Sequence, residues 1–301
     1  MHLTKHHVFG NDFLVGLETG GSPCPPGWVR AVCNRTSGVG ADGVMWVRPE
    51  DDPGAPAGPA GTRPLRAAMR LYNADGGEAE VSGNGLACLA QALTLRSGRV
   101  ESEVVIATIA GERRVVIGTS RFADADDTGT GFGRIRSRAG IHLGQPTTDE
   151  AQTGRAAAVL SEETLMPLRA GWVSIGNPHI VALLEDEGVL QTLPLESVGA
   201  AMQQRFDPVN VEAVAVLDRS RVRMRVWERG VGTTSACGSG AAAVAWQLHH
   251  WGLVSGTVEV EMPGGVAEVS VGSGVELRVP VIYVADVEAP EPAVATAGGT
   301  S

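Results

Sequence analysis

The sequence of 301 residues contains only one lysine, Lys5, and every other basic side chain apart from histidine is arginine. Enzymes that use pyridoxal phosphate hold this cofactor as a Schiff base on a lysine. Lys5 lies in a predicted N-terminal strand, and the sequence beside it has no phosphate-binding loop. The chain is therefore not expected to be a pyridoxal enzyme.

Positive charge and long apolar runs are also scarce. The formal net charge is -10 and the sequence pI is near 5.2, whereas a nucleic-acid-binding protein needs a positive face that replaces the counterions of the phosphates. No apolar run is long enough to span a bilayer, and the N-terminal residues MHLTKHHVFGNDF lack the apolar core of a signal peptide. The sequence thus predicts a cytoplasmic protein that binds neither nucleic acid nor a membrane.

Cysteine is rare and irregularly spaced, which argues against a disulfide scaffold and a zinc site. The four cysteines form no C-x-x-C pair: Cys24, Cys33, Cys88 and Cys237. The glycine-rich stretch at 38–43 lacks the lysine of a P-loop and the helix-opening context of a dinucleotide fingerprint. No metal or organic cofactor is predicted.

Hydrophobic residues make up 43% of the sequence, which is typical of a globular chain with one large core or two domains. In the first half, apolar alternation predicts strands near 2–8, 13–17, 43–48 and 67–73, then a helix at 83–97 with one apolar face, and a hairpin at 104–117. The second half repeats this order, with predicted strands at 172–176, 177–185, 211–217 and 222–228, a helix that ends near residue 251, and closing strands at 258–287.

Two similar turns lead into the two predicted helices. EVSGNGLACLA occupies residues 80–90 and SACGSGAAAVA occupies 235–245, so that Ser82 and Cys237 hold equivalent places. The repeat predicts an α+β fold of two similar domains, each a mostly antiparallel sheet wrapped around a central helix, with the active-site cleft between them. The predicted divisions are 1–130, 131–287 and a disordered tail at 288–301, with surface loops at 51–64 and 124–132.

The start of a helix suits both acid/base chemistry and anion binding. Free backbone N–H groups and the positive end of the helix dipole favour negative charge there, so they lower the pKa of a cysteine and hold a substrate carboxylate. Two acid/base groups that face each other fit the removal of a proton from one side of a carbon and its return on the other. A racemase or epimerase without cofactor needs this arrangement, together with hydrogen bonds that stabilise the carbanion.

Six successive motifs resemble those of the diaminopimelate epimerase family: GNDF at 10–13, RTSGVGADGV at 35–44, YNADGGEAEVSGNG at 72–85, GNPH at 176–179, RFDPVNVEAV at 205–214 and WERGVGTTSACGSGA at 227–241. The resemblance implies two α+β domains in a cytoplasmic enzyme, commonly a homodimer. It also implies the interconversion of LL- and meso-diaminopimelate on the route to lysine and peptidoglycan.

The resemblance further assigns roles to particular residues. Cys237 matches one of the two catalytic cysteines, and His179 matches a histidine near the reactive centre. The remaining matched positions are those that hold the substrate: Asn11, Asn73, Gly83, Asn84, Asn177, Asn210, Glu228, Arg229, Gly238 and Ser239. Among these, the two Gly-Asn and Gly-Ser pairs match the backbone groups that grip the carboxylate at the reacting centre, and Arg229 suits a distal carboxylate.

Three positions depart from the family pattern. Ser82 replaces the other catalytic cysteine, Ala87 replaces an arginine, and Thr233 replaces a glutamate. A hydroxyl ionises far less readily than a thiol, so Ser82 is a poor base, although it remains able to donate a proton. Cys88 lies six residues further into the helix and cannot reach the position of Ser82, so we interpret it as a core residue.

Three explanations of Ser82 follow from the sequence. It is a native change in a relative that acts on another amino acid or catalyses another step from the same carbanion, such as an elimination. Or it is an engineered substitution that traps substrate in an ordinary epimerase. Or the protein has lost catalysis and binds an amino acid. The retention of Asn73, Asn177, Asn210 and Arg229 together argues against the last explanation.

Overall fold

The computed structural model describes residues 1–17, 23–50, 63–79, 82–109, 111–123, 134–162, 167–206 and 209–292. The chain forms two compact units, each described here by itself: an N-terminal unit of residues 1–137 with 281–301, and a C-terminal unit of residues 138–280. Two strands, β9 (Arg134–Gly144) and β18 (Val275–Glu288), contribute residues to both units. The predicted boundary at residues 130 and 131 lies outside the described residues.

In its described residues, the N-terminal unit contains strands, one central helix and one outer helix. Its elements are β1 (His2–Val8), β2 (Asn11–Leu17), α1 (Pro26–Cys33), β3 (Gly43–Glu50), β4 (Leu65–Asn73), β5 (Glu78–Ala79), α2 (Gly83–Arg96), β6 (Ser102–Thr108), β7 (Gly111–Ile117) and β8 (Arg121–Ala123), with parts of β9 and β18.

The C-terminal unit has the same kind of sheet and central helix, with more helices outside it. Its elements are the rest of β9 and β18, β10 (Thr147–Thr148), α4 (Glu150–Glu162), β11 (Arg169–Ser174), β12 (Pro178–Leu183), α5 (Glu187–Thr192), α6 (Leu195–Arg205), β13 (Asn210–Val216), β14 (Arg221–Glu228), β15 (Gly232–Thr234), α7 (Gly238–His250), β16 (Thr257–Met262) and β17 (Gly265–Val271).

The two units share one pattern of strand pairing. In the N-terminal unit β1 pairs antiparallel with β2, β2 parallel with β3, β3 antiparallel with β4, β4 parallel with β6, and β6 antiparallel with β7. The C-terminal unit has the same order of directions: β11 pairs antiparallel with β12, β12 parallel with β13, β13 antiparallel with β14, β14 parallel with β16, and β16 antiparallel with β17. The prediction of an α+β fold with two similar, mostly antiparallel domains is therefore confirmed.

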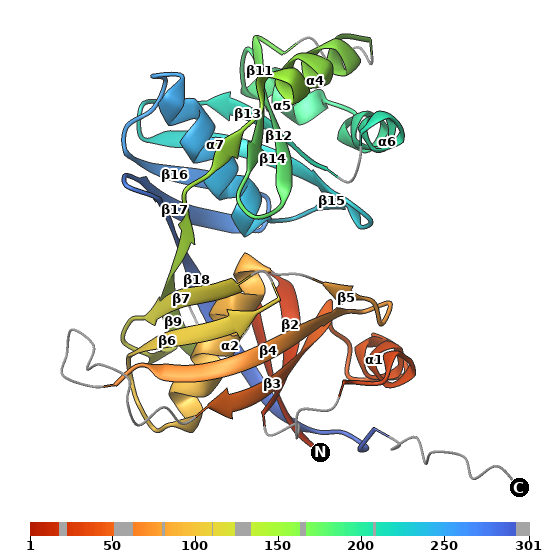
Figure 1. Cartoon of the computed structure of the whole chain (residues 1–301), viewed down its shortest axis with the longest axis vertical. Coiled ribbons are helices and arrows are strands. Elements are labelled where there is room, and N and C mark those ends of the chain that lie inside the picture. Colours follow the sequence, from red (N-terminus) through yellow and green to blue (C-terminus); the bar gives the residue numbers. More distant parts are fainter. Residues whose placement is uncertain are drawn as a thin grey trace, which may run out of the picture. The chain divides into compact units, whose positions relative to one another are not determined.

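The central helices α2 and α7 are each packed against strands of their own unit (Figure 1). The sequence predicted one apolar face for the first of these helices, but every residue of α2 from Asn84 to Thr94 is buried. Strands surround the helix, so its polar members need internal partners: Gln91 donates to Ser137 Oγ at 2.9 Å, and Thr94 donates to the carbonyl of Ala90 at 2.7 Å. The expected single face was wrong because the sheet curves around the helix.

A second layer of helices covers the other face of each sheet. In the N-terminal unit α1 packs on β3 and β4, and in the C-terminal unit α4, α5 and α6 pack on β11, β13 and β14. Side chains on alternate positions of a strand point to opposite faces. Thus Val211 and Ala213 of β13 enter the core beneath α4–α6, whereas Glu212 between them points toward α7.

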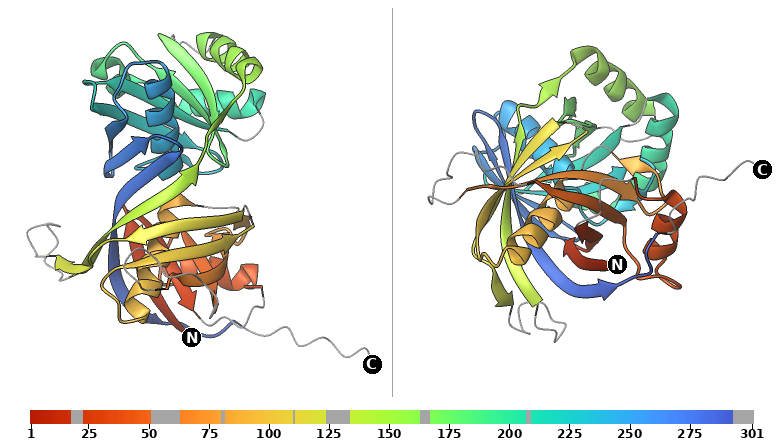
Figure 2. Two further views of the ribbon diagram at one scale, coloured as in Figure 1. Left: turned by 60° about the vertical axis from the view of Figure 1, so that its left-hand side comes forward. Right: turned by 60° about the horizontal axis from the view of Figure 1, so that its bottom comes forward.

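The C-terminal residues differ from the predicted tail at 288–301. β18 pairs antiparallel with β1 as far as Glu288. In Figure 2 the last blue strand runs past the red N-terminal end of the chain. Ala289 donates its N–H to the carbonyl of Met1 at 2.9 Å, and the carbonyl of Pro290 accepts from Trp28 Nε1 at 2.8 Å. These backbone bonds make residues 281–290 part of the N-terminal unit, whereas the predicted division placed 281–287 in the second domain.

Other sequence predictions fall on segments that the structure does not describe: residues 293–301 of the predicted tail, most of the surface loop at 51–64 and the whole of the one at 124–132. Within the described residues, no helix has the length and apolar character needed to cross a membrane.

A buried histidine makes the stability of the N-terminal unit sensitive to acid. Burial lowers the pKa of His6 from 6.5 to about 4, although a hydrogen bond to Gln91 at 2.8 Å partly opposes this. The folded state therefore favours the neutral ring. The contribution of neutral His6 to the free energy of unfolding is complete above pH 6.5 and is lost as the pH falls toward 4. We expect a loss of about 3 kcal/mol in the free energy of unfolding by pH 4.

Urea unfolding at pH 7 and pH 4 measures this effect, with His6→Gln as the comparison. Glutamine retains polar groups for Thr4 and Gln91 but has no titratable ring. The variant should lose less stability between the two pH values than the unaltered protein. An equal loss in both proteins would contradict the assignment to His6.

Candidate active site

The turn before α2 holds Ser82 as the helix cap. Ser82 has φ -132° and ψ 125°, and its Oγ accepts the N–H of Gly85 at 3.1 Å. Asn84 in the first turn is buried and donates from Nδ2 to Oδ1 of Asn11 at 3.1 Å. The structure thus brings two of the predicted substrate-holding residues, from β2 and α2, beside the predicted catalytic serine.

The turn before α7 repeats this geometry with a thiol. Cys237 has φ -132° and ψ 115°, and its Sγ accepts the N–H of Gly240 at 3.3 Å and lies 3.5 Å from Ser239 Oγ. A polar side chain at this position satisfies one of the free N–H groups of the helix start. The nearly equal dihedral angles show that the two turns are built alike.

We call the residues around the Ser82 turn the N-terminal half-site and those around the Cys237 turn the C-terminal half-site. The strand registers match further positions of these two half-sites. Phe13 of β2 pairs with Gly43 of β3, and His179 of β12 pairs with Asn210 of β13, so Phe13 corresponds to His179. Two residues further along β3 and β13, Met45 corresponds to Glu212.

The space beneath the two helices agrees with that match. A Cβ atom added to Gly85 would meet Met45, and one added to Gly240 would lie 2.6 Å from Glu212 Oε1. By the same reasoning from β4 and β14, Asn73 corresponds to Glu228. The half-site with Cys237 therefore has three titratable side chains where the half-site with Ser82 has phenylalanine, methionine and asparagine.

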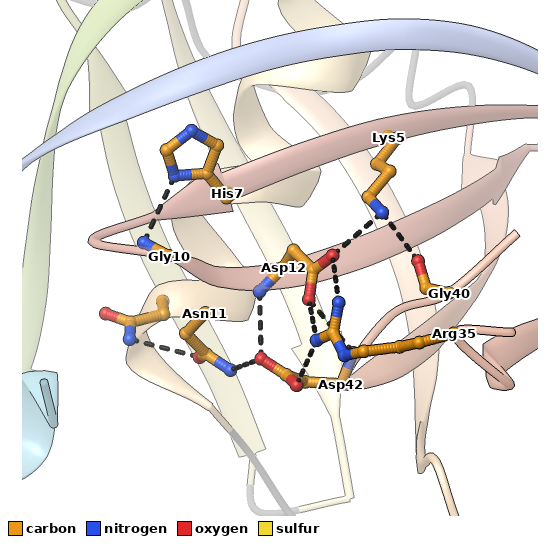
Figure 3. A network of polar contacts seen from close by, with 9 residues as sticks. Lys5, His7, Gly10, Asn11, Asp12, Arg35, Gly40 and Asp42 are labelled. Atoms are coloured by element: carbon orange, nitrogen blue, oxygen red, sulfur yellow. Dashed lines mark hydrogen bonds and ion pairs between the residues drawn. The ribbon is translucent and has the colours of Figure 1, made fainter. Parts of the chain in front are cut away.

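A charged network holds Asn11 in the N-terminal half-site (Figure 3). Asn11 Nδ2 donates to Asp42 Oδ2 at 2.8 Å, and Arg35 donates to Asp42 Oδ1 at 2.6 Å and to Asp12 Oδ1 at 2.6 Å. The single lysine, Lys5, completes the network with an ion pair to Asp12 at 2.9 Å. Burial disfavours the ionised form of Asp12, but the hydrogen bonds from Arg35 and Lys5 outweigh it and hold the pKa of Asp12 below its usual value.

The C-terminal half-site surrounds the thiol with acidic groups. Burial raises the pKa of Cys237 well above its usual value, and the carboxylates of Glu228 and Glu212 raise it further, while Ser239 and the Gly240 N–H oppose them. Burial also raises the pKa of Glu228, against hydrogen bonds from Thr234 and the thiol. The free protein consequently holds Cys237 as the neutral thiol at neutral pH.

Each half-site contains one buried atom that lacks a hydrogen-bond partner. In the part of the chain that the structure describes, only two buried side-chain nitrogen or oxygen atoms are in this state, Asn84 Oδ1 and Glu212 Oε2. A buried polar atom without a partner costs about 1–3 kcal/mol. Asn84 lies in the first turn of α2, and Glu212 of β13 lies beneath Gly240 in the first turn of α7.

The other predicted site residues lie near these turns or at the ends of the neighbouring strands. Asn210 Oδ1 accepts the N–H of Arg229 at 3.0 Å, and the exposed guanidinium of Arg229 makes no hydrogen bond or ion pair with any described residue. Asn177 Oδ1 lies 3.1 Å from His179 Nε2. Asn73 is exposed at the end of β4, and Gly83 and Gly238 open the two helices.

The remaining cysteines belong to the core. Cys24, Cys33 and Cys88 are buried with free thiols, and burial raises the pKa of Cys24 to about 11 and that of Cys33 to about 12. This confirms that Cys88 is a core residue. Among the residues described, no group of three or more histidine, cysteine, aspartate or glutamate side chains is arranged to hold a metal ion.

Sequence reasoning missed the residues behind the two half-sites. Arg35 and Asp42 lie in the motif RTSGVGADGV, in which the sequence assigns no role to either residue, and Glu212 is a lone charge in the apolar strand VEAVAV. A single charged residue within an otherwise apolar strand was the sequence signal that could have identified Glu212 as a functional residue. The contacts that define these residues join distant parts of the chain and were not visible in the sequence.

Solved structures place the fold among two-domain racemases and epimerases. A predicted epimerase from Pseudomonas aeruginosa matches with a TM-score of 0.66 at 20% identity, covering 96% of this chain and 98% of that one. A hydroxyproline epimerase from Agrobacterium vitis, solved with trans-4-hydroxy-L-proline, matches with a TM-score of 0.52 at 16% identity, covering 96% and 91%. These likenesses show that the chain shares the fold of these solved structures.

The chain belongs to the diaminopimelate epimerase family, whose model matches residues 3–122 and 171–280. Diaminopimelate epimerase from Synechococcus sp. (strain JA-2-3B'a(2-13)) is 36% identical over 275 residues, covering 88% of each chain. The same enzyme from Desulforudis audaxviator is 36% identical over 277 residues, covering 88% of this chain and 90% of the other. The protein is therefore an epimerase-type isomerase.

Proposed function

We propose that this protein is a cofactor-independent epimerase that interconverts LL- and meso-diaminopimelate by proton transfer at the α-carbon. The observation that carries this proposal is the pair of matching helix-cap turns, in which Ser82 Oγ accepts the N–H of Gly85 and Cys237 Sγ accepts the N–H of Gly240. Relatives that share 36% of their residues with this chain are named diaminopimelate epimerase. The same turn into a central helix, present in each unit with a Ser or Cys cap, supports an acid/base role for both caps.

The substrate groups have matching partners in the two half-sites. The N–H groups at Gly83-Asn84 and Gly238-Ser239 suit the carboxylate at the reacting carbon, because helix starts favour anions. The exposed guanidinium of Arg229 suits the distal carboxylate, to which it can donate two parallel hydrogen bonds. Asparagine amides both donate and accept, so Asn11 and Asn177 suit the ammonium and carboxylate groups of an amino acid.

The reaction transfers one proton on each face of the α-carbon. One of Cys237 and Ser82 takes the α-proton, the C–H electron pair stays on the carbon, and the other group delivers a proton to the opposite face. The helix N–H groups at the carboxylate stabilise the developing charge. A substrate ammonium near Glu228 and Glu212 would offset the negative charge that opposes ionisation of the Cys237 thiol.

Chiral chromatography tests the proposed reaction directly. The purified protein should convert LL-diaminopimelate into the meso form, and the meso form into the LL form, without added metal or pyridoxal phosphate. The two reactions should reach the same final ratio. If neither isomer is converted, the protein is not a diaminopimelate epimerase.

A second function is favoured by the surroundings of Ser82. Its matched neighbours Phe13, Met45 and Asn73 do not titrate, so nothing among them activates the hydroxyl as a base. The second candidate is therefore a relative that acts on another amino acid, or one that binds an amino acid without turnover. If calorimetry shows that the protein binds diaminopimelate, and NMR spectroscopy shows no exchange of the α-proton, the protein binds the amino acid without turnover.

The network behind Asn11 gives a prediction about substrate affinity. In Asp42→Asn, an amide NH2 replaces one of the two carboxylate oxygens that accept from Asn11 and Arg35, so one of these donors loses its acceptor and the network that orients Asn11 is weakened. The amide of Asn11 then loses its fixed orientation, and we expect KM for diaminopimelate to rise about tenfold with little change in kcat. Initial-rate kinetics measure both constants. Glu112→Gln, at an exposed ion pair with Arg66 in the same unit, is the control and should leave KM unchanged.

The family resemblance also predicts a homodimer, and this stays a prediction. Light scattering coupled to gel filtration would measure the mass of the particle in solution against the 31.2 kDa of one chain.

A further inference from the structure

Glu212 is a fully buried acid in an otherwise apolar strand. It lies in β13 with no exposed surface, between Val211 and Ala213, and its side chain sits beneath Gly240 in the first turn of α7. One of its carboxylate oxygens, Oε2, has no hydrogen-bond partner among the residues that the structure describes. A buried carboxylate is costly unless it is paired and fully hydrogen-bonded, so its presence calls for an explanation beyond packing.

The other oxygen of Glu212 fixes a histidine of the half-site. His179 Nδ1 lies 2.7 Å from Glu212 Oε1, and His179 Nε2 lies 3.1 Å from Asn177 Oδ1. His179 is itself fully buried. Contacts at both ring nitrogens leave the imidazole one orientation, and the contact to Glu212 is the shorter of the two.

The N-terminal unit shows that the fold does not require this carboxylate. At the matched position beneath Gly85, Met45 fills the same space, and Phe13 takes the place of His179. The two units have the same strand pairing and nearly the same helix-cap geometry. Glu212 and His179 therefore belong to the chemistry of the half-site that contains Cys237.

Two carboxylates act on the Cys237 thiol from the strands beneath α7, Glu228 at the end of β14 and Glu212 of β13. His179 of β12 contacts Glu212 and acts electrostatically on Glu228. Glu212 is the member that touches both the histidine and the first turn of α7. Its charge acts on the same sulfur that the proposed reaction needs as an acid and base.

We propose that Glu212 is a positioning residue for proton transfer at Cys237. It holds the His179 ring and keeps the sulfur protonated until the ammonium group of the substrate enters, so that the empty site does not present a reactive thiolate. This inference rests on the proposed role of Cys237. Loss of the carboxylate should therefore change the ionisation of the thiol even without substrate.

A substrate-free titration tests this inference. The protein is labelled with 13Cβ-cysteine, the Cys237 signal is assigned with Cys237→Ser, and its chemical shift is followed against pH. In Glu212→Gln the thiolate-to-thiol ratio at a given pH should rise about tenfold, because a unit negative charge next to the sulfur is removed. Glu212→Met, which copies the residue at position 45, should change the ratio in the same direction and guards against a folding defect specific to glutamine.

The control makes the same chemical change away from the site. Glu259→Gln alters an exposed carboxylate of β16 in the same unit and should leave the Cys237 titration unchanged. The inference is wrong if neither Glu212 variant moves the titration, or if Glu259→Gln moves it equally.

The pH profile of α-proton exchange provides a second readout. The rising limb for Glu212→Gln should move to lower pH by the same amount as the titration of Cys237, which a purely structural role for Glu212 would not produce. If the unaltered protein exchanges no α-proton of diaminopimelate at any pH, the proposed function fails. The substrate-free titration still decides the role of Glu212 in that case.

Discussion

Replacing Cys237 with serine is expected to slow exchange of the α-proton of diaminopimelate by about 10³-fold, because general acid/base catalysis contributes on this scale. The serine hydroxyl can still accept the N–H of Gly240, as Ser82 accepts that of Gly85, so the helix cap and the fold should survive. What is lost is the only thiol in either half-site. NMR spectroscopy of the α-position in D2O measures the rate.

A core cysteine provides the matched control. Cys24→Ser makes the same change at a buried thiol in the N-terminal unit, and it should affect stability while leaving the exchange rate per folded molecule within a few fold. Retention of most of the exchange rate in Cys237→Ser would show that another group moves the proton, and the proposed role of Cys237 would have to be given up.

Replacing Ser82 with cysteine is expected to raise the rate of inversion from the LL to the meso isomer by about 10²–10⁴-fold, the range of general acid/base catalysis. The backbone at Ser82 already has the dihedral angles of the Cys237 turn, and Gly85 already offers its N–H to the side chain. A thiol at this position has an ordinary pKa of about 8.5, whereas a hydroxyl does not ionise in this range. The variant would therefore have an acid/base group on each face.

The serine at the opposite end of the same helix tests whether the position matters. Ser97 caps the C-terminus of α2 and donates from Oγ to the carbonyl of Thr94 at 2.8 Å. Ser97→Cys should leave the rate of inversion unchanged. If Ser82→Cys inverts diaminopimelate no faster than the unaltered protein, the serine is not the limiting feature of the site.

The strands and central helices were predictable because their patterns are local. Alternating apolar residues indicated β1–β4 and β11–β14, and the glycine-rich turns at Ser82 and Cys237 indicated where α2 and α7 begin. The outer helices were missed for equally local reasons. α1 has only eight residues and begins at Pro26, and α4 buries only Ala156 and Leu160. Helices this short or this weakly apolar take their stability from the sheet against which they pack.

The position of Cys237 at the start of α7 was predictable, because one residue before a glycine-rich turn carries the signal. The site was not predictable where contact between distant residues defines it. His179 and Glu212 are 33 residues apart, and Asn11 and Asp42 are 31 apart. Only the parallel pairing of β12 with β13, and of β2 with β3, brings these side chains together.

Deuterium incorporation by the unaltered protein tests the central claim most directly, which is that Cys237 moves the α-proton of diaminopimelate. LL- and meso-diaminopimelate are incubated separately in D2O with the protein, with Cys237→Ser, and without protein. The account predicts that deuterium enters the α-position of at least one isomer with the unaltered protein, and far more slowly with Cys237→Ser. Equal incorporation with and without the unaltered protein, for both isomers, would contradict it.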